Sequence, residues 1–155
     1  MNVEHDPRVL GPGLAPTPFT AEQIRAGCPA GRMIRLLVEE EGAEPYLRFN
    51  HFTSCDEAGA VTERGRVDGG REVVTDRSSW RELQEHAAFP AEVTTIEEDT
   101  IDIPVGVVEC LRYTVRDDEG VTTFWFSAAY PGMPVRYSRV ENGRTVSTTT
   151  MIASG

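Results

Sequence analysis

The chain has 155 residues, a length that fits one domain and allows a hydrophobic core to form without disulfides or metals. Its 25 acidic and 15 basic residues give a net charge of −10, and the arginines are scattered, so charge repulsion disfavours nucleic acids and anionic membrane surfaces as partners. The sequence contains no run of about 18 apolar residues, so it predicts no helix that spans a membrane.

The N-terminal residues 1–18 are rich in proline and glycine and are predicted to form an extended arm. Residues 19–155 are predicted to form a single antiparallel β domain. The first residues, Met1 to Pro7, contain neither a basic stretch nor an apolar one, so they lack the pattern of a secretory signal. We therefore expect a soluble, cytoplasmic protein, with a leader sequence that has been removed as the open alternative.

Two segments carry the pattern of a short helix. One runs from Thr20 to about Ala26 and the other from Ser79 to about Ala88, and each begins with a capping box, in which Ser or Thr is followed three residues later by Gln or Glu. A glycine stops the first helix and a proline stops the second. The apolar side chains of the second helix share one face, so we expect it to pack against a sheet.

The rest of the chain alternates between apolar and polar residues in short runs separated by turn residues, which is typical of β-strands. The expected strands are residues 34–39, 46–55, 61–67, 72–76, 92–103, 107–115, 121–128, 135–140 and 146–152. Short turns make consecutive strands antiparallel neighbours, and Asn142-Gly143 is the strongest hairpin signal. The pattern predicts a mainly β (α+β) fold, a curved antiparallel sheet of about eight or nine strands that forms a half-barrel or open barrel on one or two short helices.

A curved sheet of this kind can enclose a cavity between its concave face and the second helix. Aromatic and apolar residues on the expected inner face would line such a cavity, and they are Phe49, Trp80, Leu83, Tyr113, Phe124 and Phe126. A solid core built from the same side chains is the structural alternative.

Four stretches of the C-terminal half lie within residues 107–152 and are Cys110–Tyr113, Thr123–Ser127, Pro131–Arg136 and Asn142-Gly143. Together they resemble the terminal strands of bacterial periplasmic lipoprotein carriers. In that family a strand bearing tryptophan is followed by a Gly-x-Pro-x-Arg stretch that leads into the next strand. The resemblance implies an unclosed antiparallel barrel over helices, with an apolar cavity for acyl chains, and therefore a lipophilic ligand.

No catalytic residue, metal site or cofactor is predicted. Cys28, Cys55 and Cys110 form no CxxC pair and are odd in number, so we expect free thiols rather than disulfides or a zinc site. His51 lies four residues from Cys55 on one expected strand, which is about 13 Å at roughly 3.3 Å per residue and too far to share a metal. His86 lies on the second expected helix, and no Ser or Cys nucleophile can be assigned to it.

Two functions are therefore open. The first is a binding module that holds a lipophilic small molecule in the cavity. The alternative is a protein-interaction module or homo-oligomer that acts through its edge strands and binds no small ligand. An enzyme is the least favoured class, because the sequence has no nucleophile elbow, phosphate loop, metal signature or dinucleotide fingerprint.

Overall fold

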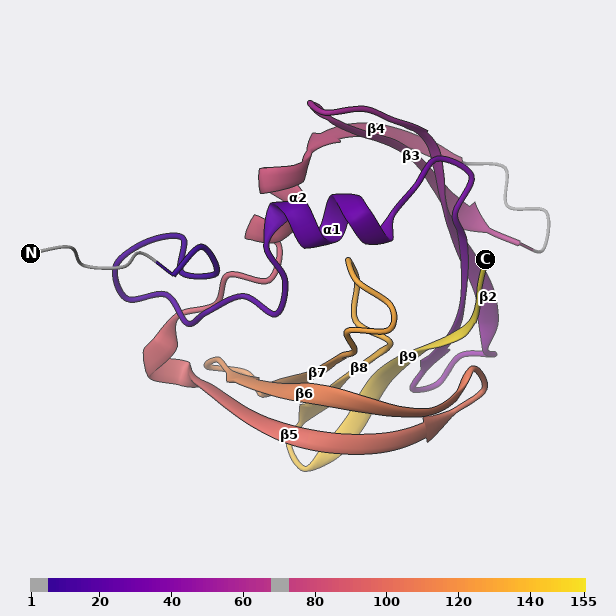
Figure 1. Cartoon of the computed structure of the whole chain (residues 1–155). Helices are drawn as coiled ribbons and strands as arrows, with labels where there is room; N and C mark the ends of the chain where they lie inside the picture. Colours follow the sequence, from indigo (N-terminus) through magenta and orange to yellow (C-terminus); the bar gives the residue numbers. More distant parts are fainter. Residues whose placement is uncertain (1–5, 68–72) are drawn as a thin grey trace, which may run out of the picture.

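The computed structural model describes residues 6–67 and 73–155. These residues form one antiparallel sheet of nine strands that curves around α1, with α2 beside it (Figure 1). The helices are α1 (Ala21–Gly27), α2 (Trp80–Glu85) and the 3-10 helix η1 (Ala91–Val93). The strands are β1 (Met33–Glu40), β2 (Tyr46–Cys55), β3 (Gly59–Arg66), β4 (Val74–Ser79), β5 (Thr94–Ile103), β6 (Gly106–Arg116), β7 (Val121–Phe126), β8 (Arg136–Glu141) and β9 (Arg144–Ser154). The predicted fold class, a curved and unclosed antiparallel sheet with two short helices, is confirmed.

The sheet consists of two meanders that meet in its centre. Its strand order is β4-β3-β2-β1-β9-β8-β7-β6-β5, so β1 pairs with β9 and the segment containing α2 connects the two outer strands. In this central pair Leu36 lies opposite Met151, and both side chains are fully buried. The sequence predicted the antiparallel neighbours within each meander but not this pairing of the first strand with the last.

The capping boxes form as predicted and determine where both helices begin. The Thr20 side chain accepts a hydrogen bond from the Gln23 backbone N–H, and the Gln23 side chain accepts one from Thr20; Ser79 and Glu82 make the same reciprocal pair. The second helix ends at Glu85 rather than near Ala88, because 3-10-type turns follow, in which the N–H groups of Ala87 and Ala88 bond to carbonyls three residues back.

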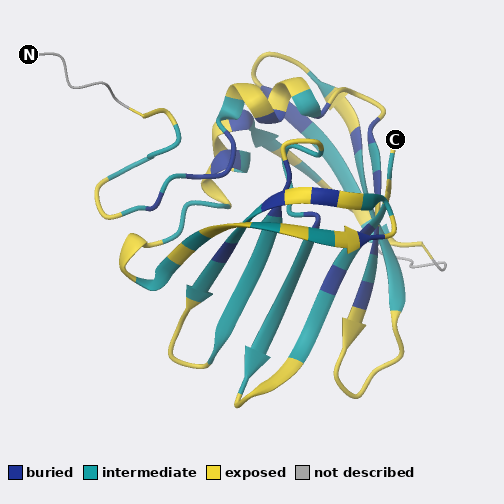
Figure 2. Ribbon diagram, turned by 60° about the horizontal axis from the view of Figure 1, so that its bottom comes forward, coloured by how far each residue is buried: buried dark blue, intermediate teal, exposed yellow. Residues whose placement is uncertain are grey.

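The core fills the space between the concave face of the sheet, the helices and the β5–β6 hairpin. Alternation along β1 places Ile34, Leu36 and Val38 on the concave face, and all three are buried. Figure 2 shows buried segments gathered where these elements meet, while the turns at the strand ends are exposed. Burying each large aliphatic side chain stabilises the fold by about 1.5–3 kcal/mol.

The two ends of the β5–β6 hairpin turn opposite sets of side chains towards the core. Val107 and Glu109, which share the strand face of the buried Tyr113 by alternation, are exposed, Val107 by 70%, while Val108 and Cys110 on the other face are buried. The Val107 end of the hairpin extends past short strands β7 and β8, and β5 contacts β9. The twist of a long two-stranded ribbon accounts for the difference, because it turns the opposite set of side chains towards the core.

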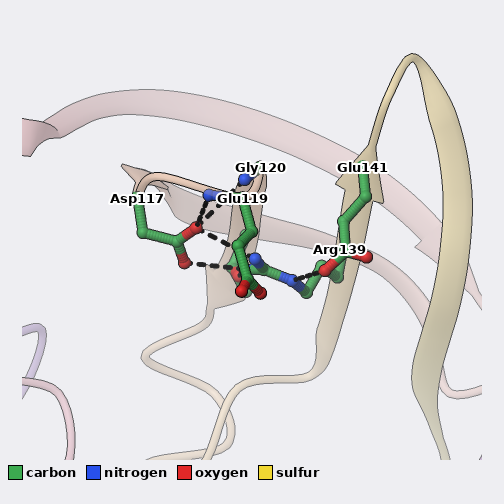
Figure 3. Close-up of polar contacts among 6 residues, drawn as sticks. Asp117, Glu119, Gly120, Arg139 and Glu141 are labelled. Atoms are coloured by element: carbon green, nitrogen blue, oxygen red, sulfur yellow. Dashed lines mark hydrogen bonds and ion pairs between the residues drawn. The ribbon is translucent and has the colours of Figure 1, made fainter.

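An arginine connects the β6–β7 turn to β8 (Figure 3). Arg139 donates hydrogen bonds from two guanidinium nitrogens to the Asp117 carboxylate, at 2.9 and 3.0 Å, and a third from Nε to Glu141 at 2.7 Å. The Asp117 carboxylate also accepts from the backbone N–H groups of Glu119 and Gly120. One carboxylate therefore both forms the turn and holds the neighbouring strand.

The described part of the N-terminal arm lies against the domain. Leu14 bridges Pro90, the Ala15 N–H donates to the Phe89 carbonyl, and Tyr113 donates its hydroxyl to the Pro16 carbonyl. Residues 1–5 of the predicted arm, and the predicted turn and strand start at 68–72, lie outside the described residues. No helix in residues 6–67 and 73–155 is long and apolar enough to cross a membrane.

Candidate functional site

A cavity of about 610 Å³ lies on the concave face of the sheet. Residues of α1, α2, strands β1 to β4, β7 and β8, and the loop before β8 line it. Its size is within the roughly 300–1,000 Å³ range of small-molecule pockets. The curvature of the sheet creates this space, because the helices cover only part of the concave face.

One end of the cavity is lined by aromatic rings. Phe124 stacks on Phe89 with ring centroids 5.0 Å apart, and on Phe126 and Tyr137 at 6.0 Å each. Phe124 lies opposite Tyr137 in the β7–β8 register, so alternation directs both side chains to the concave face. The rings form a continuous apolar surface that suits a hydrocarbon group.

Three of the six residues expected at the cavity line it. They are Leu83, Phe124 and Phe126. Trp80 and Tyr113 are buried in the adjoining core and do not line the cavity. Their polar atoms bond to the backbone, with Trp80 donating to the Asp56 carbonyl and Tyr113 to that of Pro16, both at 2.7 Å, and burial raises the pKa of Tyr113 to about 12.

Phe49 lies on the opposite face of the sheet. It pairs with the exposed Arg35, while its strand neighbours Asn50 and Phe52 line the cavity. The prediction placed Phe49 on the inner face, because the β2 side chains on its side of the strand are more apolar than those on the other side. The structure has the reverse, because the inner positions of β2 extend into a polar end of the cavity that the sequence did not reveal.

The polar end lies between β3, β4 and α2, at the free edge of the sheet. Arg64 donates a hydrogen bond to the Asp76 carboxylate at 2.7 Å, and both side chains are about half exposed. Glu82 lines the same end and caps the Ser79 N–H, which holds the pKa of its carboxyl below the usual value. Each of these residues looks like an ordinary surface residue in the sequence, and only the strand register brings them together.

A buried arginine holds the wall of the cavity formed by α1 and the loop before β8. Arg32 is only 6% exposed, and its guanidinium donates to the carbonyls of Gly27 at 2.9 Å and Pro131 at 2.7 Å, and to the Ser154 hydroxyl. Gly132, with φ of +116°, follows in the loop, and a Cβ there would lie 2.9 Å from the Cys28 sulfur. Only glycine therefore fits at this position.

The three cysteines are free thiols, and their environments suppress ionisation. Burial raises the pKa of Cys28 and Cys55, and raises that of Cys110 to about 11. A protonated thiol is a poor nucleophile and metal ligand. Within residues 6–67 and 73–155, no group of three His, Cys, Asp or Glu side chains could hold a metal ion.

No protein-family model matches the sequence, and no curated protein is similar to it at the sequence level. Solved structures with a similar fold do exist. A chain of the Pseudomonas aeruginosa MucA/MucB complex has a TM-score of 0.61 at 12% identity, covering 86% of this chain and 54% of that one. MucB in complex with MucA(peri) gives 0.62 at 14% identity, covering 87% of this chain and 53% of that one.

A protein from Bacteroides fragilis with a YmcC-like fold, described as exported, is similar over most of its length. Its TM-score is 0.51 at 9% identity, covering 81% of this chain and 96% of that one. The chain spans about half the length of the first two structures. At these identities the similarities show the fold, an open antiparallel sheet over helices, and nothing finer.

Proposed function

We propose that the protein is a binding module that holds a lipophilic small molecule in the concave cavity. The observation that supports this proposal is an aromatic surface on one side of a cavity of about 610 Å³, formed by Phe89, Phe124, Phe126 and Tyr137. A hydrocarbon group placed there leaves water for an apolar surface, which is favourable by roughly 25 cal/mol per Å² buried. The resemblance to lipoprotein carriers supports the same class of ligand.

Blocking the cavity tests this proposal. Ala87 lines the cavity on the segment after α2, so Ala87→Trp would fill space that a ligand needs. We expect the neutral dye N-phenyl-1-naphthylamine to bind the wild type, and Ala87→Trp to weaken binding by about tenfold or more, the equivalent of about 1.4 kcal/mol. Val107→Trp is the matched control, because Val107 is exposed on the β5–β6 hairpin and does not line the cavity.

A second variant keeps the test valid if Ala87→Trp does not fold. Met133→Gln places a polar group in the lining loop with little change in volume, and circular dichroism reports whether each variant is folded. The proposal fails if no dye binds the wild type, or if folded lining variants bind as tightly as Val107→Trp.

A second candidate is a protein-interaction module that acts through the β4 edge. Val73 and Val74 at this edge are 48% and 46% exposed, while the β5 edge carries the exposed acidic residues Glu97 and Glu98. Acidic side chains discourage strand addition, so the apolar start of β4 is the better place for a partner strand to add. MucB, a similar structure, was solved in complex with a protein partner.

A second copy of the chain is the partner that can be tested directly. Light scattering after gel filtration should show a concentration-dependent dimer that Val74→Lys abolishes, with Arg35→Lys on the convex face as the control. A wild type that remains monomeric at all concentrations contradicts self-association. The cytoplasmic location expected from the sequence stays a prediction, and one similar structure is of a protein described as exported.

A further inference from the structure

The cavity contains a buried amide whose hydrogen bonds the protein does not complete. Asn50 lines the cavity from β2, and its side-chain oxygen is buried without a hydrogen-bond partner among residues 6–67 and 73–155. Its side-chain nitrogen donates to the sulfur of Met133 at 3.8 Å, and a thioether is a weak acceptor. A buried carbonyl oxygen without a donor destabilises the fold, so the position of Asn50 in a cavity indicates that a ligand supplies the donor.

Asn50 lies where the apolar and polar parts of the cavity meet. On one side it pairs with Ile34 of β1, which is buried, and on the other with Arg64 of β3. Side chains directly opposite each other on neighbouring strands have Cβ atoms about 4.5–5.5 Å apart. A ligand group that bonds to the Asn50 amide can therefore contact the Arg64 guanidinium as well, while the rest of the ligand extends along the apolar part of the cavity.

The charges at the polar end are balanced or negative, not positive. Arg64 donates to the Asp76 carboxylate at 2.7 Å, so its charge is paired. Glu82 adds a second negative charge to the lining. Arg77 follows Asp76 on β4, so alternation directs its side chain to the opposite face, where it lies 3.7 Å from Asp56. An anionic head group would therefore meet no unpaired arginine among the described residues of the lining.

The hydrogen-bonding groups around Asn50 require both a donor and an acceptor. The Asn50 oxygen needs a donor, and Arg64, which donates one hydrogen bond among the described residues, has further N–H groups that need an acceptor. A hydroxyl supplies both. A carboxylate only accepts and would leave the Asn50 oxygen unmatched, whereas an ammonium only donates and would lie beside the like charge of Arg64.

We infer that the cavity selects an uncharged amphiphile whose head group both donates and accepts hydrogen bonds, as a hydroxyl does. The head group donates to the Asn50 oxygen and accepts from Arg64, and the hydrocarbon chain packs on the aromatic rings of Phe124 and Phe126. It takes the place of the Met133 thioether beside the amide, because an unbranched methionine side chain can adopt another rotamer. This inference rests on the proposed function and adds the class of head group and its position.

The test compares ligands that share one hydrocarbon chain and differ in the head group. 1-Dodecanol, its methyl ether and laurate are titrated at pH 8 against the bound dye N-phenyl-1-naphthylamine, below their micelle or solubility limits. We expect 1-dodecanol to bind about tenfold more tightly than the methyl ether, which accepts but cannot donate, and than laurate, which is an anion. The ether is the more hydrophobic of the two neutral ligands, so simple partitioning into the cavity predicts the opposite order.

A variant of Asn50 connects this preference to the amide. Asn50→Leu should weaken binding of 1-dodecanol by about tenfold and leave the methyl ether unchanged. The urea midpoint should stay the same or rise, because the variant replaces an unmatched polar group with an apolar one of similar size. His51→Leu is the matched control, since His51 follows on the same strand, faces the convex side and does not line the cavity. It should change the binding of neither ligand.

The two ways of failing are distinguishable. If neither the dye nor any of the three ligands binds, the proposed function itself is wrong. If the dye binds but 1-dodecanol binds no more tightly than the methyl ether or laurate, the head-group inference is overturned. That comparison uses the wild type alone, so it holds even if Asn50→Leu does not fold. A folded Asn50→Leu that binds 1-dodecanol as tightly as His51→Leu does also overturns the inference.

Discussion

At the scale of single residues, Asp117 is a carboxylate that its neighbours hold in the ionised form. Hydrogen bonds from Arg139 and from the backbone N–H groups of Glu119 and Gly120 hold its pKa well below the usual value (Figure 3). A depressed folded-state pKa means that the contribution to stability is complete above the unfolded pKa of about 3.9 and is lost as the pH falls towards the folded value.

We therefore expect Asp117→Asn to lower the urea midpoint at pH 7, and the difference from the wild type to shrink as the pH falls below about 4. Asp118→Asn is the control, because within the described residues Asp118 is exposed and makes no hydrogen bond or ion pair. Urea unfolding of the three proteins between pH 3 and pH 7 measures the effect. Equal midpoints for the two variants at pH 7 would contradict it.

At the scale of elements, the sequence predicts what depends on neighbours in the chain. The capping boxes at Thr20 and Ser79 form because both partners lie within one helical turn. Asn142 and Gly143 adopt φ of 52° and 74°, as the two-residue hairpin turn between β8 and β9 requires. These features need no information from distant residues.

The strand pairing and the inward faces that the sequence did not predict depend on distant residues. The pairing of β1 with β9 joins the first and the last strand of the sheet, and no turn in the sequence indicates it. The twist of the β5–β6 ribbon reverses the inward face at Val107 and Val108, although the alternation itself continues. Phe49 faces outward because the strand register places its neighbour Asn50 beside the cavity. The same register brings together the residues of the polar end of the cavity.

At the scale of the whole molecule, the sheet has a protected centre and two free edges. β1 and β9 lie in the middle of the strand order, and the concave residues Leu36 and Met151 are fully buried. Among the described strands β4 pairs with β3 alone, and each of its residues is exposed or half-buried. An unclosed sheet of this kind should open locally from its edges, because few buried contacts hold the outer strands.

Amide hydrogen exchange measures this gradient along the sheet. We expect the amides of β1 and β9 that are bonded within the sheet to exchange about a hundredfold more slowly than those of β4, a difference of about 3 kcal/mol in opening free energy. β3 has partners on both sides and serves as the internal reference next to β4. If the hydrogen-bonded β4 amides exchange as slowly as those of β1, the β4 edge is covered in solution. Repeating the measurement with Val74→Lys then shows whether a second copy covers it, because that variant should restore fast exchange in β4 and leave β1 unchanged.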